Sequence, residues 1–393
     1  MQRPLAGRRL WFVGVGGAGL SGYALLAHAW GAEVGGWDRA ETPYLGNVRA
    51  AGIDVSISPE PAVPLGWEAV VSSAFDVPGT SRAELLAELV MLQRSIVVAG
   101  AHGKTTTTAM IAFVLDRLGL DPSFLIGGEI PQLGGNARAG EGWLVVEGDE
   151  SDRTISSLRP EIAVVLNVDL DHHATFGSLA EVQALFDAWL PLVPHVVRGA
   201  ELEPVAIELQ LPGEHNRHNA AAALAALELA GVDRATGEQA LREFEGVGRR
   251  FELRGSDSVR VYDDYAHNPA KVSAAVAAAR ELEQGRVLVL FQPHLYSRTR
   301  HLARELARAL SAADAVAVTE VYAAREEPVE GVSGKLVVEA LAELRPGMPV
   351  AWSPRLEDGV RFLAGRARRG DVVLTLGAGD VDRAADLLVA ELS

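Results

Sequence analysis

Two glycine-rich loops of different composition could each bind phosphate groups. Residues 14–22 read Gly-Val-Gly-Gly-Ala-Gly-Leu-Ser-Gly, and residues 100–106 read Gly-Ala-His-Gly-Lys-Thr-Thr. A strand-like run precedes each loop and a helix-like run follows it, which places each loop at a helix start, where free N–H groups attract anions. Together the loops indicate an enzyme that holds a nucleotide-bearing substrate on one domain and ATP on the next.

The first loop fits the dinucleotide fingerprint. Gly14, Gly16 and Gly19 have the spacing that lets a pyrophosphate approach the backbone, and Asp38 follows about twenty residues later. The pattern does not say which pyrophosphate binds, because NAD and a UDP-sugar present the same group. Two other interpretations of the first loop remain open. One is an NAD-dependent oxidoreductase, which would not explain the second loop. The other is a tight turn that binds no ligand.

The second loop departs from the standard P-loop pattern, because Val98 stands where a glycine is usual. The loop nevertheless has the groups that are needed to bind ATP and Mg²⁺. Backbone N–H groups can wrap the phosphates of ATP, Lys104 can neutralise their charge, and the Thr105 hydroxyl can bind Mg²⁺. The chain has only three lysines, Lys104, Lys271 and Lys335. Since lysines are so few, the one in this loop supports a phosphate-binding role for the loop.

A magnesium site needs oxygen ligands beyond the loop, and two acidic segments follow predicted strands. Glu147 ends one strand, at the sheet edge where α/β proteins bind ligands, so it is the best candidate among these acids. We expect its neighbours Asp149, Glu150 and Asp152 to be solvated loop residues. The segment 167–173, Asn-Val-Asp-Leu-Asp-His-His, follows the next strand.

The composition is that of a globular protein, with 48% hydrophobic and 22% charged residues, and 393 residues predict two or three domains. The net charge of −16 argues against nonspecific binding of nucleic acid or anionic membranes. Without cysteine, thiolate chemistry is excluded. The apolar stretch Leu10–Trp30 is too glycine-rich for a signal peptide, and no run is long enough to span a membrane. We expect a cytoplasmic monomer or weak homodimer.

Short apolar strands alternate with helices along the whole chain, which predicts an α/β fold with parallel sheets. Helices are expected at Ser21–Trp30, Arg82–Leu92 and Asn219–Leu229. Three α/β units are predicted, with boundaries near residues 94 and 253. Their strands are expected at residues 10–13, 33–37 and 69–71, then 95–99, 143–147 and 162–166, and finally 287–291, 315–319 and 371–375.

Further motifs complete a recognisable order. Glu-Gly-Asp-Glu-Ser-Asp, His-Asn-Arg-His-Asn, Gly-Arg-Arg-Phe, Asp-Asp-Tyr-Ala-His and Phe-Gln-Pro-His-Leu-Tyr-Ser-Arg-Thr-Arg begin at residues 147, 215, 248, 263 and 291. With the two glycine loops, this order resembles the Mur ligase family of peptidoglycan synthesis over nearly the whole chain. Residues 291–300 and 320–326 resemble the branch that adds L-alanine.

The resemblance implies three domains. They are an N-terminal Rossmann-like domain for the UDP-sugar (1–93), a central P-loop ATPase domain (94–253) and a C-terminal Rossmann-like domain (254–393). It also implies an ATP- and Mg²⁺-dependent ligase. The carboxylate of UDP-N-acetylmuramate would be phosphorylated to an acyl phosphate, which L-alanine would then attack.

The resemblance also assigns roles to residues. The UDP-sugar would contact Gly14, Gly16, Gly17, Gly19, Ser21, Asp38, Ser72 and Ser73. ATP would contact Gly100, Gly103, Lys104, Thr105, Thr106, Asn216, Asn219, Arg250 and Asp264. The metal would be bound by Thr105, Glu147 and His172. Catalysis would involve Lys104, His172, His267, His294 and Arg298. The sugar carboxylate and the amino acid would face Arg298, Arg300, Tyr322 and Arg325.

Some features depart from the family pattern. Asp169-Leu170 stands where Glu-Pro is usual, and Asn268 stands where many members have a second histidine. The segment Trp189–Leu211 is shorter than usual, which predicts a reduced central domain. No lysine lies between Lys104 and Lys271, so a carbamoylated lysine in the central domain is excluded. The alternatives are a sister ligase that attaches a recycled peptide to the same sugar and a catalytically weak homologue.

Overall fold

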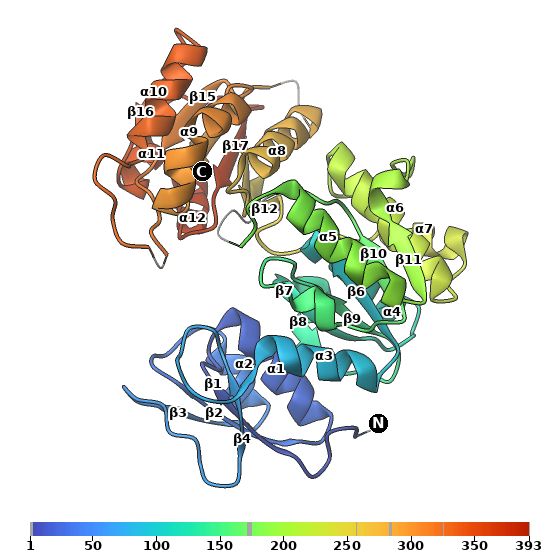
Figure 1. Cartoon of the computed structure of the whole chain (residues 1–393). Helices are drawn as coiled ribbons and strands as arrows, with labels where there is room; N and C mark the ends of the chain where they lie inside the picture. The colour runs from blue at the N-terminus through green and yellow to red at the C-terminus, as the bar shows by residue number, and fades with distance from the viewer. Residues whose placement is uncertain (1–2, 171–174, 257, 283–284, 325, 393) are drawn as a thin grey trace. The chain divides into compact units, whose positions relative to one another are not determined.

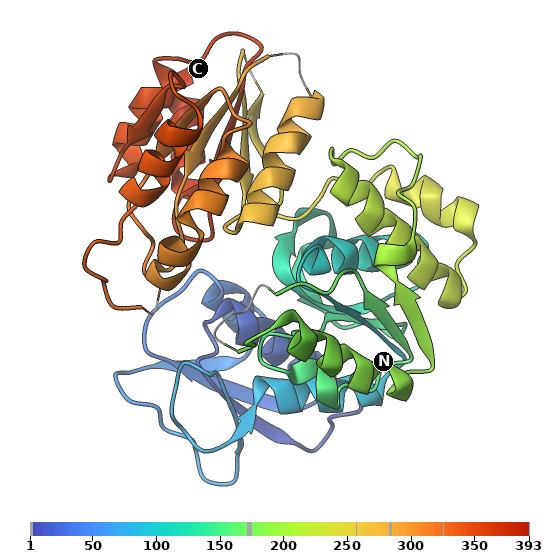
Figure 2. The same cartoon turned by 45° about the horizontal axis from the view of Figure 1, so that its top comes forward.

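The computed structural model describes residues 3–170, 175–256, 258–282, 285–324 and 326–392. The chain forms two compact units, Met1–Leu209 with Arg217–Glu245, and Gln210–Asn216 with Gly246–Ser393. Three sheets run through these units, and most helices connect parallel strands (Figures 1 and 2). The predicted α/β class with three sheets is confirmed. The domain boundaries near 94 and 253 stay predictions.

The first sheet has five parallel strands in the order β3-β2-β1-β4-β5. The order changes direction beside β1, and α/β sheets bind ligands at such a point, at the carboxyl ends of the strands. Its strands are β1 (Arg9–Val13), β2 (Glu33–Asp38), β3 (Asp54–Ile57), β4 (Glu68–Val71) and β5 (Thr80–Ser81), and its helices are α1 (Ala18–Ala29), α2 (Leu45–Ala50) and α3 (Arg82–Leu92).

The second sheet has six strands in the order β11-β10-β6-β9-β7-β8, and only the β7–β8 pair is antiparallel. Its strands are β6 (Ser95–Ala99), β7 (Ser123–Ile130), β8 (Gly135–Arg138), β9 (Leu144–Glu147), β10 (Ile162–Val165) and β11 (His195–Arg198). Its helices are α4 (Lys104–Arg117), α5 (Leu179–Trp189), α6 (Glu214–Leu229) and α7 (Arg234–Leu241), with 3₁₀ turns η1 (Pro131–Leu133), η2 (Thr154–Ser157), η3 (Leu190–Leu192) and η4 (Gly199–Glu201).

The first two sheets share one hydrophobic core, which includes Leu26 of α1, Leu89 of α3 and Leu125 of β7. Gly22 makes this close packing possible, since a Cβ atom there would lie 3.0 Å from the Cβ atom of Ala137 on β8. Helix α1 therefore connects the first glycine loop rigidly to the second sheet.

The third sheet has six strands in the order β12-β13-β17-β14-β15-β16, and only the β12–β13 pair is antiparallel. Successive residues of a strand point to opposite faces, so Leu288 and Val289 belong to different cores. Helices α8, α9 and α10 cover one face, and α11 and α12 cover the other (Figure 1). The strands are β12 (Glu252–Ser256), β13 (Arg260–Asp264), β14 (Val287–Phe291), β15 (Ala315–Val318), β16 (Val350–Trp352) and β17 (Val372–Leu376), and the helices are α8 (Pro269–Leu282), α9 (Tyr296–Leu310), α10 (Lys335–Leu344), α11 (Leu356–Ala364) and α12 (Asp382–Leu392).

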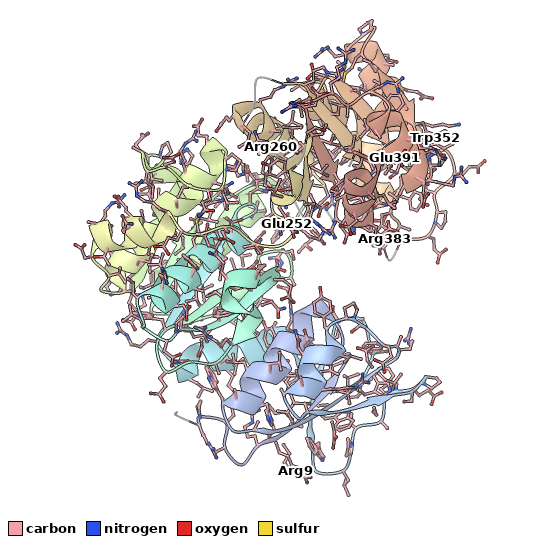
Figure 3. The ribbon with its side chains drawn as sticks, turned by 180° about the vertical axis from the view of Figure 1, so that it is seen from behind. Arg9, Glu252, Arg260, Trp352, Arg383 and Glu391 are labelled. Atoms are coloured by element: carbon pink, nitrogen blue, oxygen red, sulfur yellow. The ribbon has the colours of Figure 1, made fainter. Side chains whose placement is uncertain are left out.

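Charged side chains lie on the outside of both units, for example Arg9, Arg383 and Glu391 (Figure 3). Within the described residues, none of the helices is both long and apolar enough to cross a membrane. Among the described residues, the buried acids are Asp38 and Glu150, which lie beside the two glycine-rich loops, and Asp263 and Asp371 of the third sheet.

Candidate active site

The first glycine loop joins β1 to α1 where the strand order of the first sheet changes direction. Asp38, at the end of β2, fixes its shape: the N–H of Gly16 donates to Oδ2 and the N–H of Arg39 donates to Oδ1, both at 2.7 Å. The Thr42 hydroxyl donates to the carbonyl oxygen of Gly16 at 2.7 Å. Since both carboxylate oxygens bind backbone N–H groups, Asp38 acts here as a support of the loop.

The other residues predicted to hold the UDP-sugar surround this loop. Gly17 precedes α1 and Gly19 lies in its first turn. Ser21 is buried, and its hydroxyl has no hydrogen-bond partner among the described residues. Ser72 follows β4 and donates its N–H to the carbonyl oxygen of Val13 at 3.0 Å, beside Gly14. Ser73 is exposed in the next turn.

The second glycine loop joins β6 to α4, and two asparagines hold it from outside. The N–H of His102 donates to Oδ1 of Asn167 at 2.9 Å, and Nδ2 of Asn167 donates back to the His102 carbonyl at 3.0 Å. Asn219 of α6 lies so close to Gly103 that an added Cβ there would be 2.3 Å from its Oδ1. The loop is therefore fixed in shape before any ligand binds, with Thr106 buried in the first turn of α4.

Lys104 forms a buried ion pair. Its Nζ donates to both carboxylate oxygens of Glu150 at 2.9 Å and to the carbonyl oxygen of Gly100 at 2.7 Å. The Glu150 side chain is only 2% exposed. The expectation that Glu150 is a solvated loop residue is wrong, because the turn after β9 carries it under the loop to meet the lysine.

Thr105 and Glu147, two of the residues predicted to bind the metal, form a hydrogen bond with each other. The Thr105 hydroxyl donates to Oε2 of Glu147 at 3.1 Å, and the N–H of Gly127 donates to Oε1 at 2.6 Å. A hydroxyl and a carboxylate are the hard oxygen ligands that Mg²⁺ prefers, so these residues fit the ion. The third predicted ligand, His172, lies outside the described residues. Within the described ranges, no group of three or more histidine, aspartate or glutamate side chains could hold a metal.

A cavity of about 110 Å³ connects the two loops. It is lined by residues of α1, α3, α4 and the second sheet, among them Gly19, Tyr23, Arg82, Lys104, Glu147 and Asp149. Arg82 Nη2 lies 3.8 Å from Asp149 and 3.5 Å from Asp152. Burial raises the pKa of Tyr23, so its phenol stays neutral. A ligand on the first loop can thus extend to the lysine of the second.

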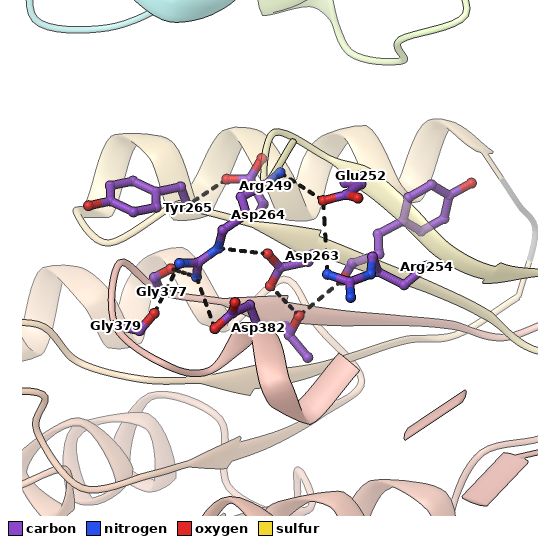
Figure 4. A network of polar contacts seen from close by, with 12 residues as sticks. Arg249, Glu252, Arg254, Asp263, Asp264, Tyr265, Gly377, Gly379 and Asp382 are labelled. Carbon is purple, nitrogen blue, oxygen red and sulfur yellow. Dashed lines mark hydrogen bonds and ion pairs between the residues drawn. The ribbon is translucent and has the colours of Figure 1, made fainter. Parts of the chain in front are cut away.

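In the other unit, Arg249 ties three segments together (Figure 4). It donates from Nε to Asp263 at 3.0 Å, from Nη1 to the carbonyl oxygen of Gly379 at 3.0 Å and from Nη2 to that of Gly377 at 2.9 Å. Asp263 is fully buried and also accepts from the Thr375 hydroxyl at 2.6 Å. This network sets the turn after β17 against the end of β13.

Asp264 and Arg250 flank that network. The carboxylate of Asp264 accepts from the N–H groups of Phe251 and Ala266, both at 2.8 Å. Burial raises the pKa of Asp264 to about 6, against the opposing effect of the Arg250 charge. The Arg250 guanidinium carbon lies 5.0 Å from the centre of the Tyr265 ring.

The remaining predicted residues of this unit lie at the carboxyl ends of the third sheet's strands. The centres of the His267 and His294 rings are 5.7 Å apart, and the Tyr322 ring stacks on His294 with centres 5.8 Å apart. Arg298 contacts His294, and Arg300 is exposed on α9. Asn216 lies in α6, where its Nδ2 donates to the carbonyl oxygen of Pro212 at 2.7 Å. Arg325 lies outside the described residues.

Comparisons with known proteins agree on one family. Sequence profiles match residues 9–93 (Mur ligase family, catalytic domain), 98–188 (Mur ligase middle domain) and 249–379 (Mur ligase, glutamate ligase domain). UDP-N-acetylmuramate–L-alanine ligase from Rubrobacter xylanophilus is 41% identical over 447 residues, which cover 97% of this chain and 99% of the relative. The chain belongs to the Mur ligase family. The crystal structure of UDP-N-acetylmuramate–alanine ligase from Thermotoga maritima is similar to this Mur ligase with a TM-score of 0.80 at 28% identity, covering 97% and 98% of the two chains.

This Mur ligase is shorter than its relatives. The alignment with UDP-N-acetylmuramate–L-alanine ligase from Streptomyces coelicolor, 38% identical, covers 99% of each chain but spans 466 positions, more than the 393 residues here. The relative therefore has internal residues without a counterpart. Between Trp189 and Leu211, where we predict the reduction, the chain has only η3, the edge strand β11 and η4. The two glycine-rich loops and Glu147 precede this segment in the sequence.

Sequence reasoning missed three residues that shape the site of this Mur ligase: Glu150, Asn167 and Arg249. Asn167 follows β10, and its position at the carboxyl end of a strand beside β6 was the available signal. Glu150 lies in the acidic motif that begins at Glu147, so the motif itself could have indicated a role. Arg249 precedes the arginine predicted to contact ATP, but no local pattern distinguishes the two.

Proposed function

We propose that this protein is an ATP-dependent ligase that joins L-alanine to the carboxylate of UDP-N-acetylmuramate, in the cytoplasm, during synthesis of peptidoglycan precursors. The relatives named for this activity support the proposal over nearly their whole length. The observation that carries it is the shared cavity, because Gly19 of the first loop and Lys104 of the second line the same space. A nucleotide-bearing acid on one loop can there meet ATP on the other.

The residues of this chain suggest how the reaction proceeds. Lys104 neutralises charge on the phosphates of ATP while the sugar carboxylate attacks the γ-phosphorus, which gives an acyl phosphate and ADP. Thr105 and Glu147 would hold Mg²⁺, which supplies further neutralisation of phosphate charge. The amine of L-alanine then attacks the acyl carbon, and phosphate leaves as the amide forms. This chemistry needs positioning and charge neutralisation more than a protein nucleophile.

The geometry of Asp38 favours a UDP-sugar over NAD on the first loop. In a dinucleotide site of this type the acidic residue after the second strand hydrogen-bonds the ribose. Here both oxygens of Asp38 accept from backbone N–H groups and the residue is buried. An NAD-dependent oxidoreductase would also not explain the second glycine-rich loop with Lys104.

Two alternatives remain within the ligase class: a sister ligase that accepts a recycled peptide, and a weak homologue. The test measures phosphate release from Mg-ATP and UDP-N-acetylmuramate with each amino acid or the recycled tripeptide added in turn. Release only with L-alanine, with the ligated product found by mass, supports the proposal. Release only with tripeptide favours the sister ligase. No release despite binding of both nucleotides favours the weak homologue, with the reduced central domain as its cause.

A further inference from the structure

Glu150 is a buried acid that takes no part in the proposed reaction, yet it binds the lysine of the second glycine-rich loop. Nζ of Lys104 lies 2.9 Å from each carboxylate oxygen of Glu150 and 2.7 Å from the carbonyl oxygen of Gly100. A lysine ammonium has three N–H donors and no acceptor. These three protein oxygens therefore match the full hydrogen-bonding capacity of Lys104, and a further acceptor can bind only by replacing one of them.

The phosphates of ATP need the same N–H donors, because the lysine of such a loop reaches the β- and γ-phosphates. The backbone acceptor cannot easily give way. A Cβ atom added to Gly100 would lie 2.8 Å from the carbonyl oxygen of Asn167, so the loop backbone is closely packed at this point. The acceptor that phosphate replaces on Lys104 is therefore an oxygen of the Glu150 side chain.

Electrostatic repulsion acts in the same direction as this exchange of hydrogen bonds. The Glu150 side chain is 2% exposed and the Lys104 side chain 17%, so water screens their charges only weakly. Phosphate oxygens that bind Lys104 approach the carboxylate that the same ammonium holds. Glu150 thus occupies the donors that phosphate requires and also repels the phosphate charge.

Resting on the proposed function, we propose that Glu150 is a positioning residue that acts through Lys104, and that its carboxylate competes with the phosphates of the nucleotide for the ammonium. The competition weakens nucleotide binding. Once the γ-phosphoryl group has passed to the sugar carboxylate, ADP carries less negative charge than ATP did. Glu150 then regains the ammonium and speeds the dissociation of ADP, a step of the kind that limits the turnover of many enzymes.

A purely supporting role of Glu150 predicts the opposite change in affinity. If the carboxylate only held Lys104 in place for the phosphates, removal of its charge would release the lysine and weaken ATP binding. If the carboxylate competes with the phosphates, removal of its charge strengthens ATP binding. The sign of one measured change therefore distinguishes the two roles.

The test substitutes Glu150→Gln, which keeps the size of the side chain and one acceptor oxygen but removes the charge. We expect the dissociation constant of ATP, measured by isothermal titration, to fall about 10-fold, which corresponds to roughly one hydrogen bond to a charged group. ADP should dissociate more slowly by a similar factor in stopped-flow measurements. The dissociation constant of AMP should stay at its wild-type value, because AMP has neither a β- nor a γ-phosphate. A general change in the shape of the loop would not distinguish the nucleotides in this way.

Two further variants support the comparison. Asp152→Asn is the matched control, because Asp152 belongs to the same acidic motif but its side chain is 45% exposed beside Arg82. It removes the same charge and should leave the affinities for ATP and AMP unchanged. Glu150→Asp keeps the charge but shortens the side chain, so it should bind ATP more tightly than the wild type and less tightly than Glu150→Gln. If Glu150→Gln does not fold, Glu150→Asp decides.

Several results would overturn the inference. They are unchanged or weaker ATP binding in Glu150→Gln, an equal gain in affinity for AMP, and an equal gain for ATP in Asp152→Asn. If Glu150→Asp is the only folded variant, ATP binding no tighter than in the wild type has the same meaning. A wild-type protein that binds neither ATP nor ADP would instead contradict the proposed function itself.

Discussion

Lys104 and Glu150 form an ion pair in which Nζ lies 2.9 Å from each carboxylate oxygen and the Glu150 side chain is almost completely buried. A buried carboxylate is costly unless a cation and hydrogen bonds compensate it. The pair fixes the amino group of the lysine within the glycine-rich loop, where it also donates to the carbonyl oxygen of Gly100. The same lysine thus has a structural role and the proposed catalytic one, and substitutions can separate them.

Lys104→Ala should abolish phosphate release and leave binding of the UDP-sugar nearly intact, because the first loop lies on a different sheet. It should also lower the free energy of unfolding by about 3 kcal/mol, since Glu150 would keep a buried charge without a partner. Thermal unfolding and isothermal titration measure the two effects.

The double variant Lys104→Ala/Glu150→Gln is the matched control for this prediction. It should recover much of the lost stability and none of the activity. Equal loss of UDP-sugar binding and phosphate release in Lys104→Ala would contradict the assignment of the two loops to different ligands.

Gly103→Ala should abolish ATP binding. Gly103 has φ +85°, and an added Cβ would lie 2.3 Å from Oδ1 of Asn219, so the loop or α6 must move. Gly119→Ala is the control, because Gly119 also has positive φ (+70°) but nothing lies within 4 Å of its added Cβ. It should cost about 1 kcal/mol of stability through backbone strain alone and leave ATP affinity unchanged. Equal ATP affinity in the two variants would show that the close contact between Gly103 and Asn219 does not affect ATP binding.

Arg249→Ala should lower the free energy of unfolding by about 3 kcal/mol, because it leaves the fully buried Asp263 without its cation and removes the donors to Gly377 and Gly379. Arg254→Ala is the control: its partners Asp386 and Glu252 are 67% and 36% exposed, and exposed pairs contribute less than about 1 kcal/mol. Chemical denaturation compares the two variants. Similar losses would show that Asp263 does not depend on Arg249.

Local patterns were sufficient to predict much of this fold from the sequence. The helix predicted at Arg82–Leu92 is α3 with the same bounds, because Ser81 and Glu84 form a capping box and the apolar spacing is regular. The strands before both glycine loops are equally clear, since buried parallel strands are continuous apolar runs. Because a clear strand precedes each loop and a helix-like run follows it, both loops could be placed at helix starts.

Features that depend on distant partners could not be predicted. Helix α6 begins at Glu214, before the predicted Asn219, because its first turns are polar and only its later part is rich in alanine. The burial of Glu150 depends on its ion pair with Lys104, which is 46 residues away in the sequence, so no local pattern reveals it. Arg249 owes its role to carbonyl oxygens that follow β17, more than a hundred residues later in the chain.

Asp264 should make stability depend on pH in a defined direction. Its pKa is about 6 in the folded protein, against an ordinary value of 3.8. Between these values the folded state holds the proton and the unfolded state has lost it, so stability falls as the pH rises through this window. The contribution of Asp264 is complete below about pH 4 and is lost above about pH 6. Asp264→Asn cannot titrate, so the wild-type advantage over this variant should be largest near pH 4 and smallest near pH 7. Urea denaturation of both proteins across this range measures the difference, and a constant difference would show that the proton is not held at Asp264.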